Sequence, residues 1–192
     1  MEEQVRRILQ ARVSQELVVP GRRRAAVLMP LYRHNGDYGM IFTLRSHTVY
    51  YHRGQISFPG GGHEPQDASL QDTALRESAE EIGLQPHDVQ ILGQLDDLLT
   101  TNSNYVVRPF VGTIPYPYPF ILDQRETASI IEVPLTFLRQ QNPPVEEVRD
   151  HEGRTVQSFF FDYQGHIIWG ATAKILKQFL DLLGPPGAAH GT

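Results

Sequence analysis

Stretches of apolar residues bounded by polar ones predict a series of β-strands in the first two thirds of the chain. Apolar residues dominate positions 25–31 and 38–44, and the polar Asn35-Gly36-Asp37 between them is typical of a tight turn, which predicts a β-hairpin. Positions 89–95 and 105–114 have the same character and predict two more strands. At least four strands are therefore expected.

Apolar residues at helical spacing predict helices in three places. Residues 2–16 and 172–183 form amphipathic stretches near the two ends of the chain. Between them, Asp67 is positioned to cap a third helix that Gly83 would end in a left-handed conformation. The inward stripe of this third helix is predicted to be Leu70, Ala74, Ser78 and Ile82.

The remaining pattern completes a layered fold. Pro134 precedes a short predicted helix, and residues 154–163 with 166–169 predict a last hairpin. No repeat or linker divides the chain. Strands interleaved with helices indicate one α+β domain over residues 1–183, with a sheet between helices, and a loose tail at 184–192.

Two segments leave the oligomeric state open. The N-terminal helix at residues 2–16 and the Pro115–Pro119 segment, in which proline alternates with tyrosine, could each support a homodimer or cover the core of a monomer. The Pro-Tyr segment could also be a recognition surface, although a stiff loop at the edge of a sheet is the commoner structure for such a pattern.

The run from Arg76 to Leu84 concentrates negative charge on one helix. Glu77 lies three residues before Glu80 and four before Glu81, so the three carboxylates share a face and repel one another. The last two also lie near the C-terminal end, where the helix dipole disfavours anions. A solvated acidic face is the usual explanation, but a hard cation such as Mg²⁺ or Mn²⁺ would resolve the repulsion.

This run and the glycines before it resemble the Nudix box of the Nudix hydrolase superfamily, G-x5-E-x7-R-E-U-x-E-E-x-G-U, where U is apolar. Gly61 matches the first glycine, Arg76 and Glu77 match the R-E pair, and Glu80 and Glu81 match the E-E pair. Three positions depart from the pattern. Asp67 replaces the first glutamate, and Ser78 replaces an apolar residue. The gap from Asp67 to Arg76 is one residue longer than in the pattern, which indicates a longer approach loop or a distorted first turn of the helix.

A second segment is similar to the signature that precedes the box in coenzyme A pyrophosphatases. The matching residues are Arg45, Ser46, Gly54 and the run Phe58-Pro59-Gly60-Gly61, whereas Tyr50 stands where that signature has arginine. Tyrosine at this position offers one hydroxyl group where arginine would offer a charged guanidinium with two parallel donors, and Arg53 could compensate for this difference. Residues 168–173, Ile-Trp-Gly-Ala-Thr-Ala, also resemble a segment of that subfamily.

The resemblance implies an α/β/α sandwich around a mixed sheet and assigns roles to individual residues. It implies that Glu77, Glu80 and Glu81 hold Mg²⁺ or Mn²⁺, with the Gly61 carbonyl as a further oxygen, and that Arg76 orients a box carboxylate. An ordinary surface ion pair is the alternative role for Arg76. Substrate contacts are expected from Arg45, Ser46, His52, Arg53 and Phe58.

The general base is expected to come from outside the box. Relatives of this type often keep an acidic residue in a late loop, which makes Glu126 the candidate for base or additional metal ligand. Asp96, Asp97 and Glu132 are rivals, and each could equally be a solvated loop carboxylate. His52 and His63 are expected to lie in loops near the substrate.

Composition narrows the class of protein. The 192 residues include no cysteine, which excludes disulfides and cysteine nucleophiles, and the net charge of -5 gives no overall attraction to nucleic acid. The cluster Arg22-Arg23-Arg24 could bind phosphate, but a solvated turn is the commoner case. No apolar run is long enough to span a bilayer and no signal peptide is visible, so a cytoplasmic protein without membrane or nucleic-acid partners is expected.

These observations predict a metal-dependent pyrophosphohydrolase whose leading substrate is coenzyme A or an acyl derivative. ADP-ribose or another nucleoside diphosphate derivative is the runner-up, favoured by the missing arginine at Tyr50. A non-catalytic Nudix-fold module that binds a nucleotide is the third possibility. The intact set of box charges favours an enzyme over that module.

Overall fold

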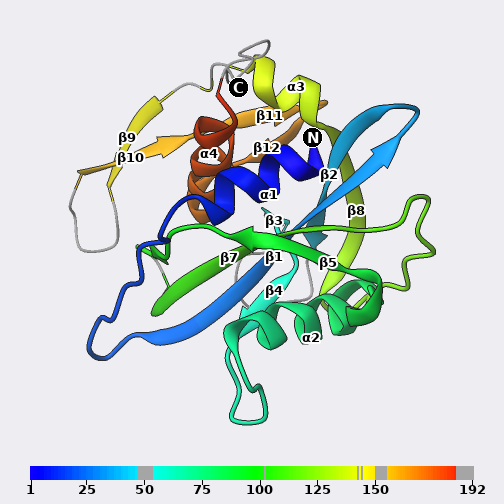
Figure 1. Cartoon of the computed structure of the whole chain (residues 1–192). Helices are drawn as coiled ribbons and strands as arrows, with labels where there is room; N and C mark the ends of the chain where they lie inside the picture. The colour runs from blue at the N-terminus through cyan, green and yellow to red at the C-terminus, as the bar shows by residue number, and fades with distance from the viewer. Residues whose placement is uncertain (47–53, 102, 142, 144, 150–154, 185–192) are drawn as a thin grey trace.

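A mixed central sheet carries helices on both of its faces (Figure 1). The structure is a computed structural model that describes residues 1–46, 54–101, 103–141, 143, 145–149 and 155–184. Figure 1 shows helix α2 across one face of the sheet, with α1 and α4 on the other. This arrangement confirms the expected α+β sandwich.

The helices and strands follow one another in an order that alternates sheet and helix. In sequence they are α1 (Glu2–Gln10), β1 (Arg23–His34), β2 (Asp37–Arg45), β3 (Ile56–Ser57), β4 (Gly60–Gly62), α2 (Leu70–Ile82), the 3-10 turn η1 (Pro86–Asp88), β5 (Gln90–Gln94), β6 (Leu98–Leu99), β7 (Tyr105–Thr113), β8 (Thr127–Pro134), α3 (Leu135–Gln140), β9 (Val145–Arg149), β10 (Thr155–Phe159), β11 (Phe161–Tyr163), β12 (His166–Ile168) and α4 (Gly170–Leu183). Of the helices in the described part of the chain, none is long and apolar enough to cross a membrane.

The predicted hairpin is the centre of the sheet. Strands β1 and β2 pair antiparallel through a two-residue turn in which Asn35 and Gly36 have φ of 50° and 91°. Positive φ at both turn positions matches the right-handed twist of the strands and suits an Asn-Gly pair. Strand β1 also pairs parallel with β7, which makes the sheet mixed and runs the order β3-β2-β1-β7-β5 through its middle.

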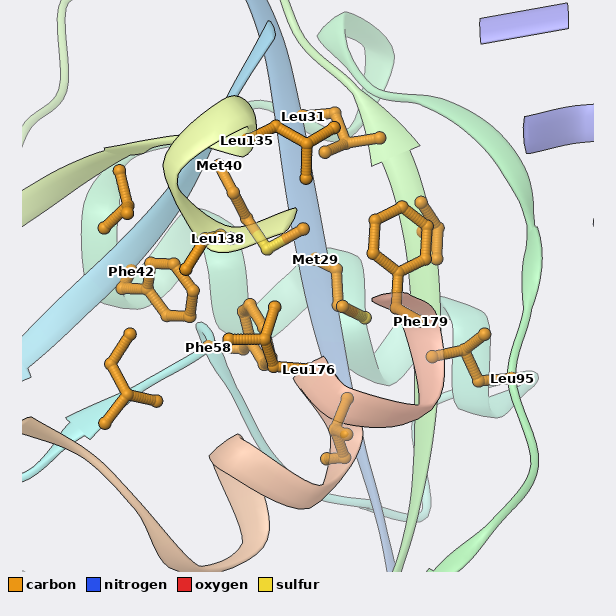
Figure 2. Close-up of a cluster of buried hydrophobic side chains, with 14 of the residues drawn as sticks. Met29, Leu31, Met40, Phe42, Phe58, Leu95, Leu135, Leu138, Leu176 and Phe179 are labelled. Carbon is orange, nitrogen blue, oxygen red and sulfur yellow. The ribbon is translucent and has the colours of Figure 1, made fainter. Parts of the chain in front are cut away.

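Alternation along β1 divides the interior into two cores. Met29 and Leu31 point to the side of α1, α3 and α4, where Figure 2 shows them among Met40, Phe42, Leu176 and Phe179. Ala26 and Leu28 point to the opposite side and pack beneath α2. A strand buried on both faces is therefore apolar at nearly every position, which is why residues 25–31 form an unbroken apolar run.

Helix α2 begins at Leu70 and its N-cap is Ser69. The prediction that Asp67 caps this helix was therefore wrong. The Ser69 hydroxyl accepts from the Asp72 N–H at 3.2 Å. The residue in excess of the Nudix pattern is thus absorbed in the approach loop before the helix. Gly83 ends the helix at φ 71°, as predicted.

The N-terminal helix is shorter than predicted, because α1 ends at Gln10 rather than near residue 16. The following amides are used elsewhere: the Gln15 N–H donates to Asp96 at 2.7 Å and the Leu17 N–H donates to Asp97 at 2.9 Å. Val13, which lies within the segment predicted to be helical, is 96% exposed.

The second half of the chain matches the predictions in part. The short helix α3 after Pro134 is present, and α4 contains the predicted 172–183 helix. In place of the one predicted last hairpin, the structure has two antiparallel strand pairs: β10 pairs with β9, and β11 pairs with β12. Strand β8, which pairs with β2 over most of its length, was not predicted.

A buried ion cluster fastens the loop after β5 to the sheet. The Asp97 carboxylate, whose side chain is fully buried, accepts from Arg108 at 2.8 Å and from Arg24 at 3.0 Å. Burial alone raises the pKa of Asp97, but hydrogen bonds from Arg108 and the Leu17 N–H outweigh it, and the pKa is lowered overall. Asp97 is therefore held ionised as part of the fold.

We expect Asp97→Asn to destabilise the protein by about 3–5 kcal/mol in chemical denaturation, because it removes the buried anion that Arg108 and the partly exposed Arg24 share. Asp96→Asn, at the partly exposed neighbouring carboxylate, is the matched control and should cost clearly less. Since the folded-state pKa of Asp97 is lowered, the stabilisation exists above the unfolded pKa and is lost as pH falls. A wild-type advantage that persisted undiminished toward pH 2 would contradict this assignment.

Candidate active site

A cavity of about 540 Å³ opens between the glycine strand β4, the C-terminal half of α2 and the N-terminus of α4. Glu77, Glu81 and Glu126 lie at one side of it. The turn between β6 and β7 and the segment that starts α4 line it elsewhere, through the residues Thr100, Thr101, Ser103, Tyr105, Trp169, Gly170, Ala171 and Thr172.

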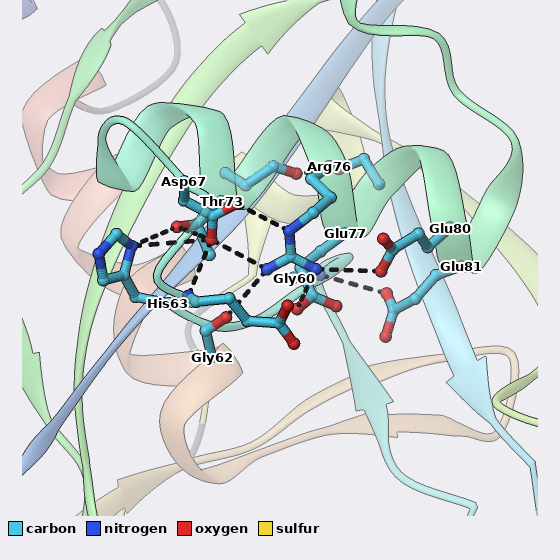
Figure 3. Close-up of polar contacts among 12 residues, drawn as sticks. Gly60, Gly62, His63, Asp67, Thr73, Arg76, Glu77, Glu80 and Glu81 are labelled. Atoms are coloured by element: carbon cyan, nitrogen blue, oxygen red, sulfur yellow. Dashed lines mark hydrogen bonds and ion pairs between the residues drawn. The ribbon is translucent and has the colours of Figure 1, made fainter.

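Arg76 organises the carboxylates of the box (Figure 3). Its guanidinium donates to both Asp67 oxygens at 2.8 and 3.0 Å, to Glu77 at 3.0 Å, to Glu80 at 3.0 Å and to the Gly62 carbonyl at 3.1 Å. These bonds raise the pKa of Arg76, chiefly through Asp67, so the arginine stays charged. Its side chain is largely buried, and this geometry is more than a surface ion pair.

Asp67 is the anchor of this arginine rather than a helix cap. Its Oδ2 atom also accepts from the Thr73 hydroxyl and from the Glu64 N–H, both at 2.9 Å. The hydrogen bonds from Arg76 hold the pKa of Asp67 well below its usual range. A carboxylate at the place of the first box glutamate was the sequence signal for this role, and interpreting it as a cap missed that.

Gly61 leaves room for the first box carboxylate. A β-carbon added at Gly61 would collide with the carboxyl group of Glu77, so any other residue here would displace this carboxylate from its place beside β4. Burial raises the pKa of Glu77; Arg76 opposes this shift, while Glu80 and Glu126 add to it. The cavity therefore presents a carboxylate that lacks full charge compensation.

Glu81 is the most deeply buried carboxylate of the box, with 4% of its side chain exposed. It accepts from the Gly60 N–H at 3.2 Å and lies 3.6 Å from an Arg45 nitrogen. Burial raises the pKa of Glu81 to about 8, against the opposing effect of Arg45. In the absence of a further cation, ionised Glu81 is a cost to the folded state.

Glu126 lies with these carboxylates, as its prediction as base or ligand requires. It lines the same cavity, and its charge raises the pKa of both Glu77 and Glu81. The Ser46 N–H donates to the Glu126 carbonyl at 2.8 Å, which joins its loop to the end of β2. The rivals lie elsewhere: Asp96 and Asp97 bind Arg12 and Arg108, and Glu132 accepts from Tyr116 at 2.8 Å.

Glu80 differs from its two box partners. Its side chain is 60% exposed, it bonds Arg76, and it does not line the cavity. Among the described residues, no three carboxylate or imidazole groups form a ready-made metal cluster. Mg²⁺ commonly takes only one or two protein carboxylates and completes its shell with water and substrate phosphate, so the partly buried Glu77 and the buried Glu81 fit a hard divalent cation.

The other predicted substrate residues fall into three groups. Arg45 and Phe58 line the cavity, and the Phe58 ring stacks on Phe42 with ring centroids 4.7 Å apart. Ser46 is buried beside the cavity without lining it. His52 and Arg53, like Tyr50, lie outside the described residues. His63 contacts Thr73 at 3.0 Å and does not line the cavity, so its predicted place near the substrate finds no support.

Two groups of cavity residues were missed by sequence reasoning. Thr100 and Ser103 come from the β6–β7 turn and Tyr105 from the start of β7, a region that carries no motif that could have marked it. Trp169 and Thr172 belong to the segment 168–173, whose resemblance to one subfamily was a usable signal. The Thr172 hydroxyl donates to the Ile56 carbonyl at 3.1 Å and so fixes the start of α4 beside β3.

Comparison with known proteins agrees with this geometry. Residues 22–164 match the model of the NUDIX domain family. A protein of Photorhabdus laumondii named "Uncharacterized Nudix hydrolase NudL" is 38% identical over 156 residues, which cover 81% of this chain and 82% of that protein. The protein of the same name from Enterobacter is 34% identical over 180 residues, which cover 92% and 90% of the two chains.

Solved structures show the same fold at low identity. A NUDIX hydrolase from Alicyclobacillus acidocaldarius superposes with a TM-score of 0.55 at 17% identity over 85% of this chain and 93% of that one. A MutT/nudix family protein from Enterococcus faecalis has a TM-score of 0.54 at 15% identity, covering 91% and 71%. The chain belongs to the Nudix hydrolase family, on the strength of the family match and the relatives above 30% identity.

We expect Glu81→Gln to stabilise the metal-free protein at pH 8.5 and to have a much smaller effect at pH 5. Because the folded-state pKa of Glu81 is raised, its protonated form stabilises the fold below the unfolded pKa, and this contribution is lost as pH rises through about 8. Glutamine keeps the shape and an oxygen for the Gly60 N–H. Each kcal/mol should appear as about 2–4 °C in Tm, measured with chelator present.

Glu80→Gln is the matched control for that measurement, since Glu80 is mainly exposed and should show little pH-dependent change in Tm. Equal Tm differences at both pH values for Glu81→Gln would show that the carboxyl group is not held in an unfavourable buried state.

Proposed function

We propose that this protein is a divalent-metal-dependent pyrophosphohydrolase that cleaves the diphosphate of coenzyme A or an acyl derivative. The observation that carries the proposal is the convergence of separate sequence segments on one cavity. Arg45 and the Phe58–Gly61 run come from one segment, Glu77 and Glu81 from the box, and Trp169 to Thr172 from the third. Segments that resemble one subfamily and share a single cavity support a substrate of that subfamily.

Glu77 and Glu81 would hold Mg²⁺ or Mn²⁺, with the Gly61 carbonyl as a further oxygen and Glu80 within reach only after leaving Arg76. When bound, such an ion neutralises phosphate oxygens and lowers the pKa of coordinated water. Arg76 keeps the Glu77 side chain in place through its hydrogen bond at 3.0 Å. The hydrogen bonds from Arg76 to Asp67 hold the guanidinium in place. The Glu77 carboxylate is therefore bound to an arginine that is itself anchored.

Glu126 is the proposed general base. Hydrolysis of a diphosphate adds water across one P–O–P bond: the water oxygen bonds to phosphorus, the bridging P–O bond breaks, and the water proton must be taken up. Glu126 lies beside Glu77 and Glu81 and has a backbone position fixed by Ser46. Cleavage of coenzyme A in this way yields phosphopantetheine and adenosine 3′,5′-bisphosphate.

The mixed character of the cavity suits a substrate with both an anionic centre and less polar ends. Ile56, Phe58 and Ile175 provide apolar lining, and Trp169 is 39% exposed at the start of α4. An exposed indole provides a face for a base or an apolar arm. These features support coenzyme A over inorganic diphosphate, whereas the choice between coenzyme A and ADP-ribose is left to measurement.

A product assay tests the proposal. We expect the purified protein with Mg²⁺ or Mn²⁺ to convert coenzyme A to phosphopantetheine and adenosine 3′,5′-bisphosphate, with chelator abolishing the reaction. Glu81→Gln should lower kcat/KM more than about a hundredfold, the effect of losing one preorganised charge. ADP-ribose and acetyl-coenzyme A complete the panel.

The outcomes of the panel are distinct. Efficient turnover of ADP-ribose with none of coenzyme A would replace the substrate and keep the enzyme class. Nucleotide binding without any product would indicate a binding module. Wild-type turnover by Glu81→Gln at saturating Mg²⁺ would refute its assignment as a metal ligand.

Glu126→Gln should lower kcat with little change in KM and remove the acidic limb of the kcat–pH profile, because glutamine cannot accept the proton. The measurement is a pH series of initial rates at saturating substrate. Glu132→Gln is the matched control, since this carboxylate bonds Tyr116 outside the cavity. An unchanged profile for Glu126→Gln, with a collapsed rate for Glu132→Gln, would transfer the role.

A further inference from the structure

The three consecutive arginines at the start of β1 have different surroundings. Arg24 donates to the Leu17 carbonyl at 2.6 Å and to Asp97 at 3.0 Å, which places it in the buried ion cluster. Arg22 donates to the Asn104 side chain at 3.1 Å. Both therefore have structural roles, and Arg23 differs from them.

Arg23 lies on the face of β1 that forms the cavity wall. Side chains two apart on a strand share a face, and Ala25 and Val27, the next two on this face, line the cavity. The Arg23 guanidinium lies 5.2 Å from the ring centroid of Tyr105, which lines the cavity from the neighbouring strand β7. Its Nη2 atom lies 3.8 Å from the position of a β-carbon on Gly62, another lining residue.

The charge of Arg23 is also not compensated by any carboxylate in the described part of the chain. Arg45 pairs with Glu81 and Arg76 with Glu77, so these two compensate carboxylates of the box. Arg23 has no carboxylate partner among the described residues and is exposed. The cation–π contact with Tyr105 restricts the guanidinium without neutralising its charge, so its N–H donors can still bind an anion.

Arg23, on β1, lies beside the end of β4 that is farther from Glu81. Gly60 contacts Glu81 at one end of β4, Gly61 lies against the Glu77 carboxyl group, and Gly62 lies beside Arg23 at the other end. Two residues of extended strand span about 6.6 Å. A group bound at Arg23 would therefore be a second anionic group of a substrate whose diphosphate lies at Glu77 and Glu81.

We propose that Arg23, held on the Tyr105 ring, binds a phosphate monoester of the substrate that is remote from its diphosphate. Arginine forms paired hydrogen bonds with phosphate oxygens, and a monoester offers three of them. The inference deepens the proposed function, because the 3′-phosphate of coenzyme A is such a group. Arg45, next to Glu81, is then left to the diphosphate end of the substrate.

The test compares adenosine 3′,5′-bisphosphate with AMP, which lacks the 3′-phosphate, in calorimetric titrations of the intact protein with Mg²⁺. We expect wild-type protein to bind the bisphosphate more tightly and Arg23→Gln to weaken that binding about tenfold or more, the scale of a charged hydrogen bond. AMP binding should stay within about twofold. The preference should shrink at high salt, because Arg23 is exposed.

Arg22→Gln is the matched control, one residue away and of equal charge, and should leave both affinities unchanged. Arg23→Lys keeps the charge without the fork and should fall between wild type and Arg23→Gln. Equal loss for both nucleotides in Arg23→Gln, an equal effect of Arg22→Gln, or a wild type that binds neither nucleotide or binds both equally would overturn the proposal.

The two proposals fail separately. Titration with monophosphates requires no hydrolysis, so a selective effect of Arg23→Gln would stand even if coenzyme A were not cleaved. Hydrolysis of coenzyme A and its 3′-dephospho form at equal rates by wild type and Arg23→Gln would support the proposed enzyme class and contradict the role of Arg23.

Discussion

The close approach of helix α2 to the glycine strand β4 is the constraint on which the site depends. A β-carbon at Gly61 would collide with the Glu77 carboxyl group, and one at Gly60 would collide with the backbone of β1. Gly60 also has a φ of 152° and donates its N–H to Glu81. Glycine at position 60 thus keeps β4 against β1, glycine at position 61 leaves the Glu77 carboxylate its place, and two carboxylates from successive helical turns reach one cavity.

This arrangement places stability and function in opposition. Burial raises the pKa of Glu77 and of Glu81, so the fold bears a cost when these groups are ionised and no cation is bound. Part of the compensation comes from Arg76, whose bonds to Asp67 hold it in position. The Asp97 cluster is the opposite case, because its hydrogen bonds lower the pKa and its charge supports the fold.

The sequence predicted correctly those turns and helix ends that depend on the conformation of one or two residues. The Asn35-Gly36 turn and the Gly83 stop both depend on backbone conformations that few residues adopt, and both were found where expected. The assignment of Asp67 as an N-cap failed because a short carboxylate suits both a helix cap and a partner for arginine. Which role it takes depends on the tertiary contact with Arg76, which the local sequence does not show. Strand β8 escaped prediction because its partner β2 is distant in sequence.

The candidate site divides along the same line. The box residues and the candidate Glu126 were visible in the sequence, whereas setting aside its rival Asp97 required knowing that Glu126 lines the cavity and that Asp97 is bound by two arginines. The run Arg22-Arg23-Arg24 is the clearest example of this difference, because the sequence alone does not distinguish the roles of three identical neighbouring residues. Strand alternation does: Arg24 turns into the ion cluster, and Arg23 turns to the wall formed by Ala25 and Val27. A positive charge is thus available beside two lining residues, Tyr105 and Gly62, of a cavity whose described lining includes one arginine, Arg45, which is already paired with a carboxylate.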